Sequence, residues 1–294
     1  MIHPKVTVVI PTFNRWPYVC EAIDSVLRQT YEHTECFIVD DFSTDFSYEN
    51  IVNKYKAKVK IVKNHENKEK SFSRNRGVKE CDADLVCFLD SDDLLTENSI
   101  EVRVKLFIED LKFDGVSFGY RRDNSQKAIF NDKNFEKLSL EQYIKENSYL
   151  HINNIMLSRS NMLQYGMFNT KLTNREDVEL FVRLLCSLEF RYCKQETSIV
   201  RKLTNTSAQT NFSKIIEQKF LFSEAIENDD KISIKLDDSF IKKIKRDEFL
   251  DLMRAYYRSG QNREFRKYFW QAKKKRGLKL RFKDYRRYFF SYLK

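Results

Sequence analysis

Three carboxylates stand within the four residues Asp90-Ser91-Asp92-Asp93, directly after the apolar run of residues 85–89. That run predicts a buried strand, so the carboxylates lie where the strand ends. Like charges at this spacing repel one another unless a cation or a proton intervenes. Mg²⁺ and Mn²⁺ bind carboxylate oxygens, and Mg²⁺ in proteins commonly binds substrate phosphates as well. The sequence therefore predicts a Mn²⁺ or Mg²⁺ site that receives a phosphorylated substrate.

The segments around this cluster alternate between strand and helix. Short apolar runs predict strands at residues 6–10, 36–39, 59–62, 85–89 and 116–120. Helical spacing of apolar residues predicts helices at residues 18–27, 47–55, 71–79 and 96–108, with Ser71 and Thr96 as N-caps. Strands that alternate with helices form a mainly parallel sheet covered on both faces, which places the chain in the α/β class.

Polar residues follow three of the predicted strands. Thr12-Phe13-Asn14-Arg15 follows the first strand, Asp40-Asp41 the second, and the acidic cluster the fourth. Ligands of open parallel sheets bind at the carboxyl ends of the strands, so we expect these segments to converge on one crevice. A solvated turn would also explain Asp40-Asp41, because Asp favours turns, but the position of the pair after a buried strand favours a ligand role.

The second half of the chain is less regular. Residues 124–149 are polar and weakly patterned, and we interpret them as an insertion beside the site, while residues 152–157 predict a further strand. Residues 176–188 predict an amphipathic helix, and the chain turns helical after residue 211. We therefore expect a sheet domain, residues 1–210, followed by a helical extension, residues 211–294.

Composition excludes several classes of protein. The six cysteines show no metal-finger spacing and the four histidines form no zinc-type pair, so we expect reduced cysteines and no zinc chemistry. No apolar run reaches the roughly 18 residues that a membrane-spanning helix needs, and residues 6–10 are too short for the core of a signal peptide. These features predict a cytosolic chain without a transmembrane helix.

Five motifs are informative because they occur together and in a fixed order. They are VVIPTFNR at residues 8–15, SVLRQTY at 25–31, VDDFSTD at 39–45, SRNRG at 73–77 and FLDSDD at 88–93. As a set they resemble the inverting glycosyltransferases of family 2, which have the GT-A fold, a Rossmann-like fold of nucleotide-diphospho-sugar transferases. The resemblance covers roughly residues 5–205.

The resemblance implies a nucleotide-sugar site beside the first two strands. Asp41 matches the aspartate that accepts a hydrogen bond from the nucleotide base, and an ionised carboxylate suits the imide N–H of uracil because it only accepts. Phe13 matches an aromatic residue close to the base, although core filling would explain it too. The remaining members of the implied site are Pro11, Thr12, Asn14 and Ser91.

Two features of residues 67–77 leave questions open. Arg74 lies either against the pyrophosphate or beside the acidic cluster, and a solvated helix residue is the simpler alternative. The family often has glycine where this chain has Glu69, so the conformation of that loop cannot be carried over from the resemblance.

The acidic residues resemble two further elements of the family. In the cluster that resembles the DxD element, the resemblance implies Asp92 as the direct metal ligand, Asp90 as a contact to ribose or to metal-bound water, and Asp93 as a support. Glu176-Asp177 resembles the ED motif, with Asp177 as general base and Glu176 as its neighbour or an acceptor ligand, and an exchange of these roles stays open. Acidic helix N-termini would explain both segments in part, but three clustered carboxylates exceed what a helix end needs.

The implied reaction is the transfer of a hexosyl group, with inversion, from a UDP-sugar to a glycan or lipid-linked acceptor in polysaccharide or lipopolysaccharide biosynthesis. A divalent ion neutralises the diphosphate leaving group, and a carboxylate accepts the proton of the acceptor hydroxyl. A nucleotidyltransferase would also need acidic metal ligands, but the sequence lacks its Gly-rich, Lys-bearing phosphate loop. An inactive sugar-nucleotide fold that binds membranes or nucleic acid is the other alternative.

The C-terminal residues carry most of the charge. Residues 252–294 contain 15 Lys and Arg against Glu264 and Asp284, a net +13, so the other residues sum to −3 of the total of +10. Aromatic residues interleave with these cations, as on proteins that dock on anionic membranes. Packing of the aromatics on the main domain explains the pattern equally well, and single-stranded nucleic acid is a weaker explanation. The family resemblance favours the membrane, and thus a peripheral location on the inner face of the cell membrane.

Overall fold

The computed structural model describes residues 3–110, 112–123, 128–129, 137–145, 150–165, 167–201, 212–235, 238–274 and 280–292. The chain divides into two compact units, Met1–Thr204 and Asn205–Lys294, called here the sheet unit and the helical unit. The domain boundary expected between residues 210 and 211 falls outside the described residues, as do most of the residues 124–149 expected to form an insertion.

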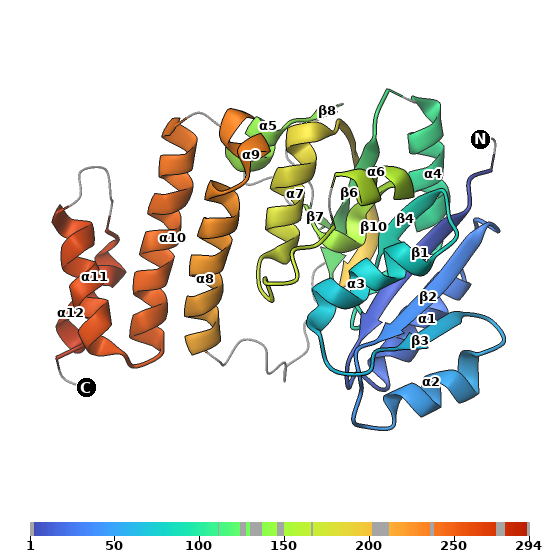
Figure 1. Ribbon diagram of the computed structural model, residues 1–294, viewed down its shortest axis with the longest axis horizontal. Coiled ribbons are helices and arrows are strands. Elements are labelled where there is room, and N and C mark those ends of the chain that lie inside the picture. Colours follow the sequence, from blue (N-terminus) through green and yellow to red (C-terminus); the bar gives the residue numbers. More distant parts are fainter. Residues whose placement is uncertain are drawn as a thin grey trace. The chain divides into compact units, whose positions relative to one another are not determined.

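The sheet unit is built on one mixed sheet. Its strands follow the order β3-β2-β1-β4-β9-β6-β10-β5, and β7 and β8 pair with β6 and β10 (Figure 1). The strands are β1 (Val6–Thr12), β2 (Thr34–Asp40), β3 (Lys60–Lys63), β4 (Leu85–Phe88), β5 (Leu94–Leu95), β6 (Gly115–Arg122), β7 (Ala128–Ile129), β8 (Lys137–Leu138), β9 (Ile155–Ser158) and β10 (Phe190–Val200).

Strand direction confirms the predicted α/β class. Strands β3, β2, β1 and β4 are mutually parallel, and β6 is parallel to β10. Between these two groups lies β9, which is antiparallel to both β4 and β6. Thr12 is in register with Asp40, and Val9 with Phe88, so the loops after β1, β2 and β4 leave the sheet at the same edge, as predicted.

Helices cover both faces of this sheet. The helices of the unit are α1 (Tyr18–Leu27), α2 (Ser47–Tyr55), α3 (Glu69–Glu80), α4 (Ser99–Glu109), α5 (Leu140–Lys145), α6 (Arg159–Gln164) and α7 (Glu176–Ser187). One face packs α1, α2 and α4 against Val8 and Ile10 of β1. The other face is covered by α3, which approaches so closely that a Cβ on Gly77 would lie 2.3 Å from Val9 Cγ1. This close approach fixes α3 along the strands that lead to the candidate site.

Three local predictions need correction. Ser71 is not an N-cap, because α3 begins at Glu69 and the buried Ser71 Oγ instead donates to the Leu172 carbonyl at 3.0 Å. Thr96 is not an N-cap either, since α4 begins at Ser99 after Asn98. Residues 152–157 are only partly strand, because Ile152–Asn154 forms a 3₁₀ turn before β9. At Ser71 this tertiary contact overrides the local preference for an N-cap.

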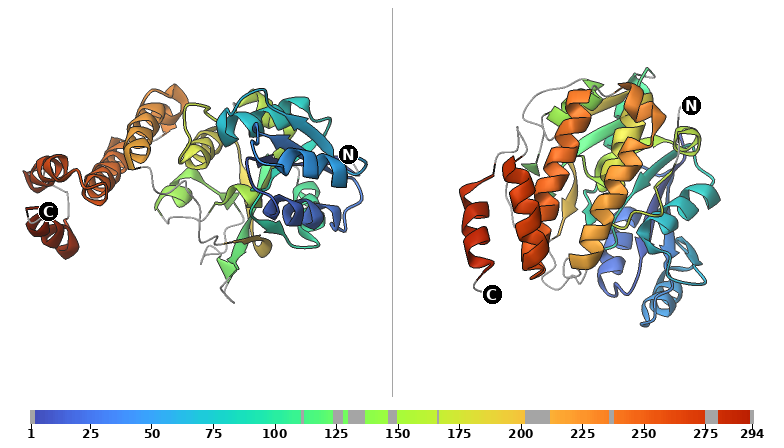
Figure 2. Two further views of the ribbon diagram at one scale, coloured as in Figure 1. Left: turned by 90° about the horizontal axis from the view of Figure 1, so that it is seen from below. Right: turned by 60° about the vertical axis from the view of Figure 1, so that its left-hand side comes forward.

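The helical unit is a row of helices with a small aromatic core. It contains α8 (Phe212–Glu227), α9 (Asp230–Lys235), α10 (Asp238–Arg258), α11 (Asn262–Lys274) and α12 (Phe282–Phe290), and α8, α10, α11 and α12 lie side by side in Figures 1 and 2. Phe265 and Phe269 are buried with Met253, and the Phe269 ring stacks on Tyr288 with centroids 4.3 Å apart. Many of the aromatics noted in the sequence thus pack within this unit. No helix among the described residues is long and apolar enough to cross a membrane.

Candidate active site

Asp41 is held by donors from three segments at the edge where β1 and β2 end. Its Oδ1 accepts hydrogen bonds from Asn64 Nδ2 at 2.7 Å, Lys68 N at 3.0 Å and Ser73 Oγ at 3.1 Å. Its other oxygen, Oδ2, has no partner among the residues described. The carboxylate is therefore fixed in place with one oxygen left to accept from a ligand, which suits the base-binding role that the sequence implies.

The loop after β1 is tied to the loop after β2. Asn14 Oδ1 accepts from Thr44 N at 2.8 Å, and Asn14 Nδ2 donates to Thr44 Oγ1 at 3.1 Å. Pro11 and Thr12 are the last residues of β1, and the buried Thr12 Oγ1 has no hydrogen-bond partner within the described part of the chain. Phe13 is 40% exposed, so it is available to stack on a ligand rather than fill the core. Asn14 therefore positions the loop, and the Phe13 ring beside it is exposed.

Backbone strain concentrates in the loops at this edge. Four described residues other than glycine have positive φ: Asn14 at 50°, Phe42 at 66°, Glu69 at 69° and Arg175 at 62°. The first three follow β1, β2 and β3, and Arg175 precedes α7. Glu69 thus adopts the left-handed conformation that glycine reaches without steric cost, which answers the question about its loop. Such strain typically collects where a protein binds or reacts.

Arg74 joins the two acidic segments of the sequence. Its guanidinium is almost fully buried, with Nη1 donating to Glu176 Oε1 at 3.0 Å and Nη2 donating to Asp90 Oδ1. Lys70 Nζ adds a second cation 2.6 Å from the same Glu176 oxygen. Of the positions expected for Arg74, the structure shows the one beside the acidic cluster. The end of β4 and the start of α7, 86 residues apart in sequence, therefore share one buried charge network.

Asp90, Asp93 and His151 form the described group that could hold a metal ion. One ligand atom from each lies within 4.8 Å of the others. Asn153 braces the cluster, because its Nδ2 donates to Asp93 Oδ2 at 2.7 Å and its Oδ1 accepts from Asp90 N at 2.9 Å. Two carboxylates and an imidazole are ligands that Mn²⁺ accepts, and carboxylates suit Mg²⁺ as well. The residues present therefore fit a divalent ion.

The electrostatics of this group also favour a cation. Burial and the charge of Asp90 raise the pKa of Asp93 to about 8. Burial alone would raise the pKa of Asp90 as well, but the Arg74 guanidinium and Lys70 hold it below its usual value. Burial lowers the pKa of His151, which keeps the imidazole neutral and able to bind a metal. Asp93 is thus the carboxylate that the protein's own cations leave least compensated.

Asp92 and Ser91 lie beside this group rather than in it. Asp92 is half-buried, and its pKa is raised by burial and by Asp90. Arg201 closes the same loop, since its backbone N–H donates to Asp93 Oδ1 at 2.8 Å and its Nε donates to the Asp92 carbonyl. Ser91, expected to contact the nucleotide sugar, is buried. The roles of Asp92 as direct ligand and of Asp93 as support stay predictions, and the geometry favours Asp93 and His151 as ligands.

The start of α7 presents two carboxylates with different surroundings. Glu176 is buried; its Oε1 accepts from Arg74 while its Oε2 has no hydrogen-bond partner among the described residues. Asp177 Oδ1 accepts from the N–H of Val178 at 2.8 Å. Burial, and then the charge of Glu176, raise the pKa of Asp177. A raised pKa brings a carboxylate closer to what a general base needs near neutral pH.

Sequence reasoning missed three residues of this site. His151 has no second histidine at metal-ligand spacing, and the polar Asn153 lies within a predicted strand. Lys70 stood in a basic stretch that resembles a solvated helix start. The polar pair Asn153-Asn154 inside an otherwise apolar run was the signal that could have revealed the turn.

Solved structures share this architecture. TarS of Staphylococcus aureus, residues 1–349 in complex with UDP-GlcNAc, superimposes with a TM-score of 0.67 at 18% identity, covering 98% of this chain and 79% of that chain. The mannosyltransferase PcManGT of Pyrobaculum calidifontis, in complex with GDP-Man and Mn²⁺, gives a TM-score of 0.60 at 16% identity over 86% and 72% of the two chains. At these identities the likeness shows the fold, which is the GT-A fold of nucleotide-sugar transferases.

The sequence match is more specific. Residues 7–166, more than half of the chain, match the family described as glycosyl transferase family 2. The chain therefore belongs to glycosyl transferase family 2 and is a glycosyltransferase. Among curated relatives, the putative teichuronic acid biosynthesis glycosyltransferase TuaG of Bacillus subtilis is 27% identical over 230 residues, 76% of this chain and 89% of that protein.

Proposed function

We propose that this glycosyltransferase moves a hexosyl group from a UDP-sugar, with inversion, to a hydroxyl of a glycan or lipid-linked acceptor in cell-surface glycan biosynthesis. The observation that carries the proposal is the buried network in which Arg74 links Asp90, at the end of β4, to Glu176, beside Asp177. It joins the candidate metal ligands to a carboxylate pair in which burial and the charge of Glu176 raise the pKa of Asp177. The UDP-GlcNAc complex of TarS and the name of TuaG support the donor class and the pathway class.

Each side of the network has its own task. Asp41 and Phe13 bind the uracil base, the first through its free carboxylate oxygen and the second by stacking on the ring. Asp177 accepts the proton of the acceptor hydroxyl as that oxygen attacks the anomeric carbon, and Glu176 Oε2 accepts a hydrogen bond from a sugar hydroxyl. A single displacement by the acceptor inverts the anomeric centre, so no covalent nucleophile is needed.

The metal belongs to the leaving-group side. Asp90, Asp93 and His151 would hold Mn²⁺ or Mg²⁺, with Asp92 as the competing ligand implied by the sequence. When bound, such an ion supplies charge neutralisation for the departing diphosphate. The Mn²⁺ complex of PcManGT supports a divalent ion in this fold. Arg74 and Lys70 add fixed positive charge on the same side of the crevice.

Calorimetric titration with UDP, ADP and GDP, each with Mn²⁺ and with EDTA, tests this proposal. We expect UDP to bind best, and to bind more weakly in EDTA because no ion then neutralises the diphosphate. His151→Ala should weaken Mn²⁺ binding by about tenfold or more. The control His33→Ala, an exposed histidine far along the sequence from the cluster, should leave it unchanged. Failure to bind any nucleotide would favour the alternative of an inactive fold, and a larger effect of Asp92→Asn than of His151→Ala would restore Asp92 as the ligand.

We also propose that the helical unit docks on an anionic membrane surface, which would place the enzyme at the inner face of the cell membrane. Phe282 and Phe289 of α12 are 83% and 67% exposed, beside the exposed Arg286. Exposed aromatics among cations suit the headgroup region of acidic lipids. Phe282→Ser/Phe289→Ser should reduce sedimentation with phosphatidylglycerol vesicles, whereas Phe46→Ser, which removes a side chain 80% exposed in the sheet unit, should not. Equal sedimentation of all three proteins contradicts the docking.

A further inference from the structure

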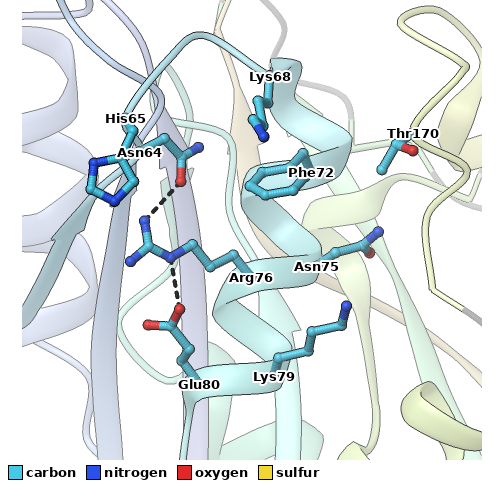
Figure 3. A pocket seen from close by; sticks show the side chains of 9 residues that line it. All are labelled: Asn64, His65, Lys68, Phe72, Asn75, Arg76, Lys79, Glu80 and Thr170. Atoms are coloured by element: carbon cyan, nitrogen blue, oxygen red, sulfur yellow. Dashed lines mark hydrogen bonds and ion pairs between the residues drawn. The ribbon is translucent and has the colours of Figure 1, made fainter.

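A separate pocket runs along the outer face of α3. It has a volume of about 560 Å³, within the range of small-molecule sites. Its walls come from the loop after β3, from α3 and from the segment that leads to α7 (Figure 3). The lining residues are Asn64, His65, Lys68, Phe72, Asn75, Arg76, Lys79, Glu80 and Thr170.

Helical geometry separates this pocket from the network at Arg74. Phe72, Asn75, Arg76 and Lys79 recur at spacings of three and four, so they share one face of α3, whereas Arg74 projects from the opposite side toward Glu176. Asn64 connects the two regions: its Nδ2 donates to Asp41 Oδ1, and its Oδ1 accepts from Arg76 Nη1 at 2.8 Å. A ligand in the pocket would therefore lie next to the nucleotide site without occupying it.

The pocket carries an excess of positive charge. Lys68, Arg76 and Lys79 face one carboxylate, Glu80, which accepts from Arg76 Nε at 2.7 Å. Lys79 Nζ has no hydrogen-bond or ion-pair partner within the described chain, and Lys68 Nζ pairs with the exposed Glu66 at 3.0 Å and lies over the Phe72 ring, 4.9 Å from its centroid. Two ammonium groups are thus available to an anion such as a phosphate or a carboxylate.

The neutral groups of the pocket suit a sugar. Phe72 presents an aromatic ring toward the pocket, and Thr170 adds a hydroxyl on the facing wall (Figure 3). An aromatic surface can pack against the apolar face of a pyranose while polar groups bind its hydroxyls. Thr170 belongs to a segment held on α3 by Asn75, which bonds both the N–H and the carbonyl of Phe168. The same segment leads to Asp177, the residue on the acceptor side.

We propose that this pocket binds an anionic saccharide unit of the acceptor, carrying a phosphate or a carboxylate, at a distance from the reacting hydroxyl. The acceptor role rests on the proposed glycosyl transfer, whereas the binding itself does not. The pocket gives the enzyme a way to distinguish charged acceptor chains from neutral ones, because Lys68 and Lys79 contribute only when the bound unit is anionic.

Calorimetry on the full chain, saturated with UDP and Mn²⁺, tests the pocket with four probes: glucose 6-phosphate, glucuronic acid, glucose and inorganic phosphate. We expect glucose 6-phosphate, glucuronic acid or both to bind, with glucose and inorganic phosphate about tenfold weaker. Lys68→Ala/Lys79→Ala should weaken the anionic sugars about tenfold. Lys105→Ala, which removes an exposed lysine from α4, should leave them unchanged. The backbone N–H of Lys68 that donates to Asp41 is retained in the double variant.

Each of the remaining outcomes of this experiment contradicts one part of the proposal. If inorganic phosphate binds as tightly as glucose 6-phosphate, the pocket does not recognise a saccharide. If the anionic sugars bind the double variant as tightly as the parent, they do not bind in this pocket. A protein that binds UDP but neither anionic sugar keeps the proposed function and loses this inference. A protein that binds an anionic sugar through Lys68 and Lys79 but binds no UDP loses the acceptor role and the proposed function together.

Discussion

Two buried aspartates, Asp93 in the sheet unit and Asp284 in the helical unit, have opposite electrostatics. Asp284 accepts from Arg254 Nη2 at 3.0 Å, Arg287 Nη1 at 3.1 Å and the N–H of Arg281 at 3.0 Å. Burial opposes its ionisation, but these partners, above all Arg254, hold its pKa below the usual value. Among the residues that the structure describes, Asp93 accepts only from the neutral donors Asn153 Nδ2 and Arg201 N, and its pKa rises to about 8.

The contrast separates a carboxylate that stabilises structure from one that awaits a ligand. At Asp284 the protein supplies the compensating charge itself, so nothing further is needed there. At Asp93 the described cations of the site are already engaged, Arg74 and Lys70 with Asp90 and Glu176, and the Arg201 guanidinium with the Asp92 carbonyl and Glu21. The missing positive charge must come from outside the chain, as a proton or a metal ion. A buried carboxylate that its own protein leaves uncompensated is thus a better marker of function than burial alone.

The largest expected effect is on the rate of sugar transfer, at the candidate active site of the sheet unit. Asp177→Asn should lower the rate of sugar transfer by about 10²- to 10⁴-fold, because an amide cannot accept the proton of the acceptor hydroxyl. Steady-state assays with UDP-sugar and acceptor measure the change. The control Asp82→Asn, in the loop before β4, should transfer at the parental rate. Full transfer by Asp177→Asn would move the base to Glu176 and reverse the assignment of the pair.

Substitution of the compensated carboxylate, Asp284, should change the stability of the helical unit. Asp284→Asn should lower the free energy of unfolding of the helical unit by about 3 kcal/mol, since Arg254 and Arg287 lose their buried counter-charge. The chain has two tryptophans, Trp16 and Trp270, so in a Trp16→Phe background the fluorescence of Trp270 in α11 reports the helical unit during urea unfolding.

The sign of the pH dependence follows from the lowered pKa of Asp284. The folded state holds the ionised form, so the stabilisation is complete above the unfolded pKa near 3.8 and is lost as the pH falls through the lower folded pKa. The difference between parent and Asp284→Asn should therefore be constant at neutral pH and shrink below about pH 4. A difference that persists in strong acid would mean that packing, and not charge, sets the contribution of Asp284.

Asp93 should make the free energy of unfolding change with pH in the opposite direction. Its folded pKa of about 8 lies above the unfolded value of 3.8, so the folded state retains a proton that the unfolded state has lost. In metal-free buffer, raising the pH from 4 to 8 should then destabilise the parent by about 5 kcal/mol through this group. Asp93→Asn cannot ionise and should lack this slope, as urea titrations at a series of pH values would show. Added Mn²⁺ should remove the destabilisation in the parent alone.

The sequence predicted these regions to different depths. Hydrophobic periodicity located β1, β2, β4 and the helices between them, because a buried strand and an amphipathic helix leave a regular pattern. The five ordered motifs predicted which strand ends would meet. They could not show that Arg74 would bridge Asp90 and Glu176, or that His151 would join the cluster, because those contacts depend on how β9 and α7 pack against β4 and α3. The pairing of Asp284 with Arg254 was equally invisible, since thirty residues separate them.

The smallest expected effects come from backbone strain, which can also be compared between the two units. In the helical unit the described residue with positive φ is Gly260 at 74°, whereas the sheet unit places Glu69 at 69°. Gly260→Ala should cost about 1 kcal/mol, although a Cβ there would meet no atom within 4 Å, because the backbone conformation itself disfavours a side chain. Glu69→Gly should gain up to about 1 kcal/mol by relieving that strain, less the contacts of the glutamate side chain. Urea midpoints of the two variants measure these changes. If Glu69→Gly raised stability while weakening UDP binding, the strained loop would be held in place for the substrate; equal losses from both substitutions would contradict any difference in strain between the two units.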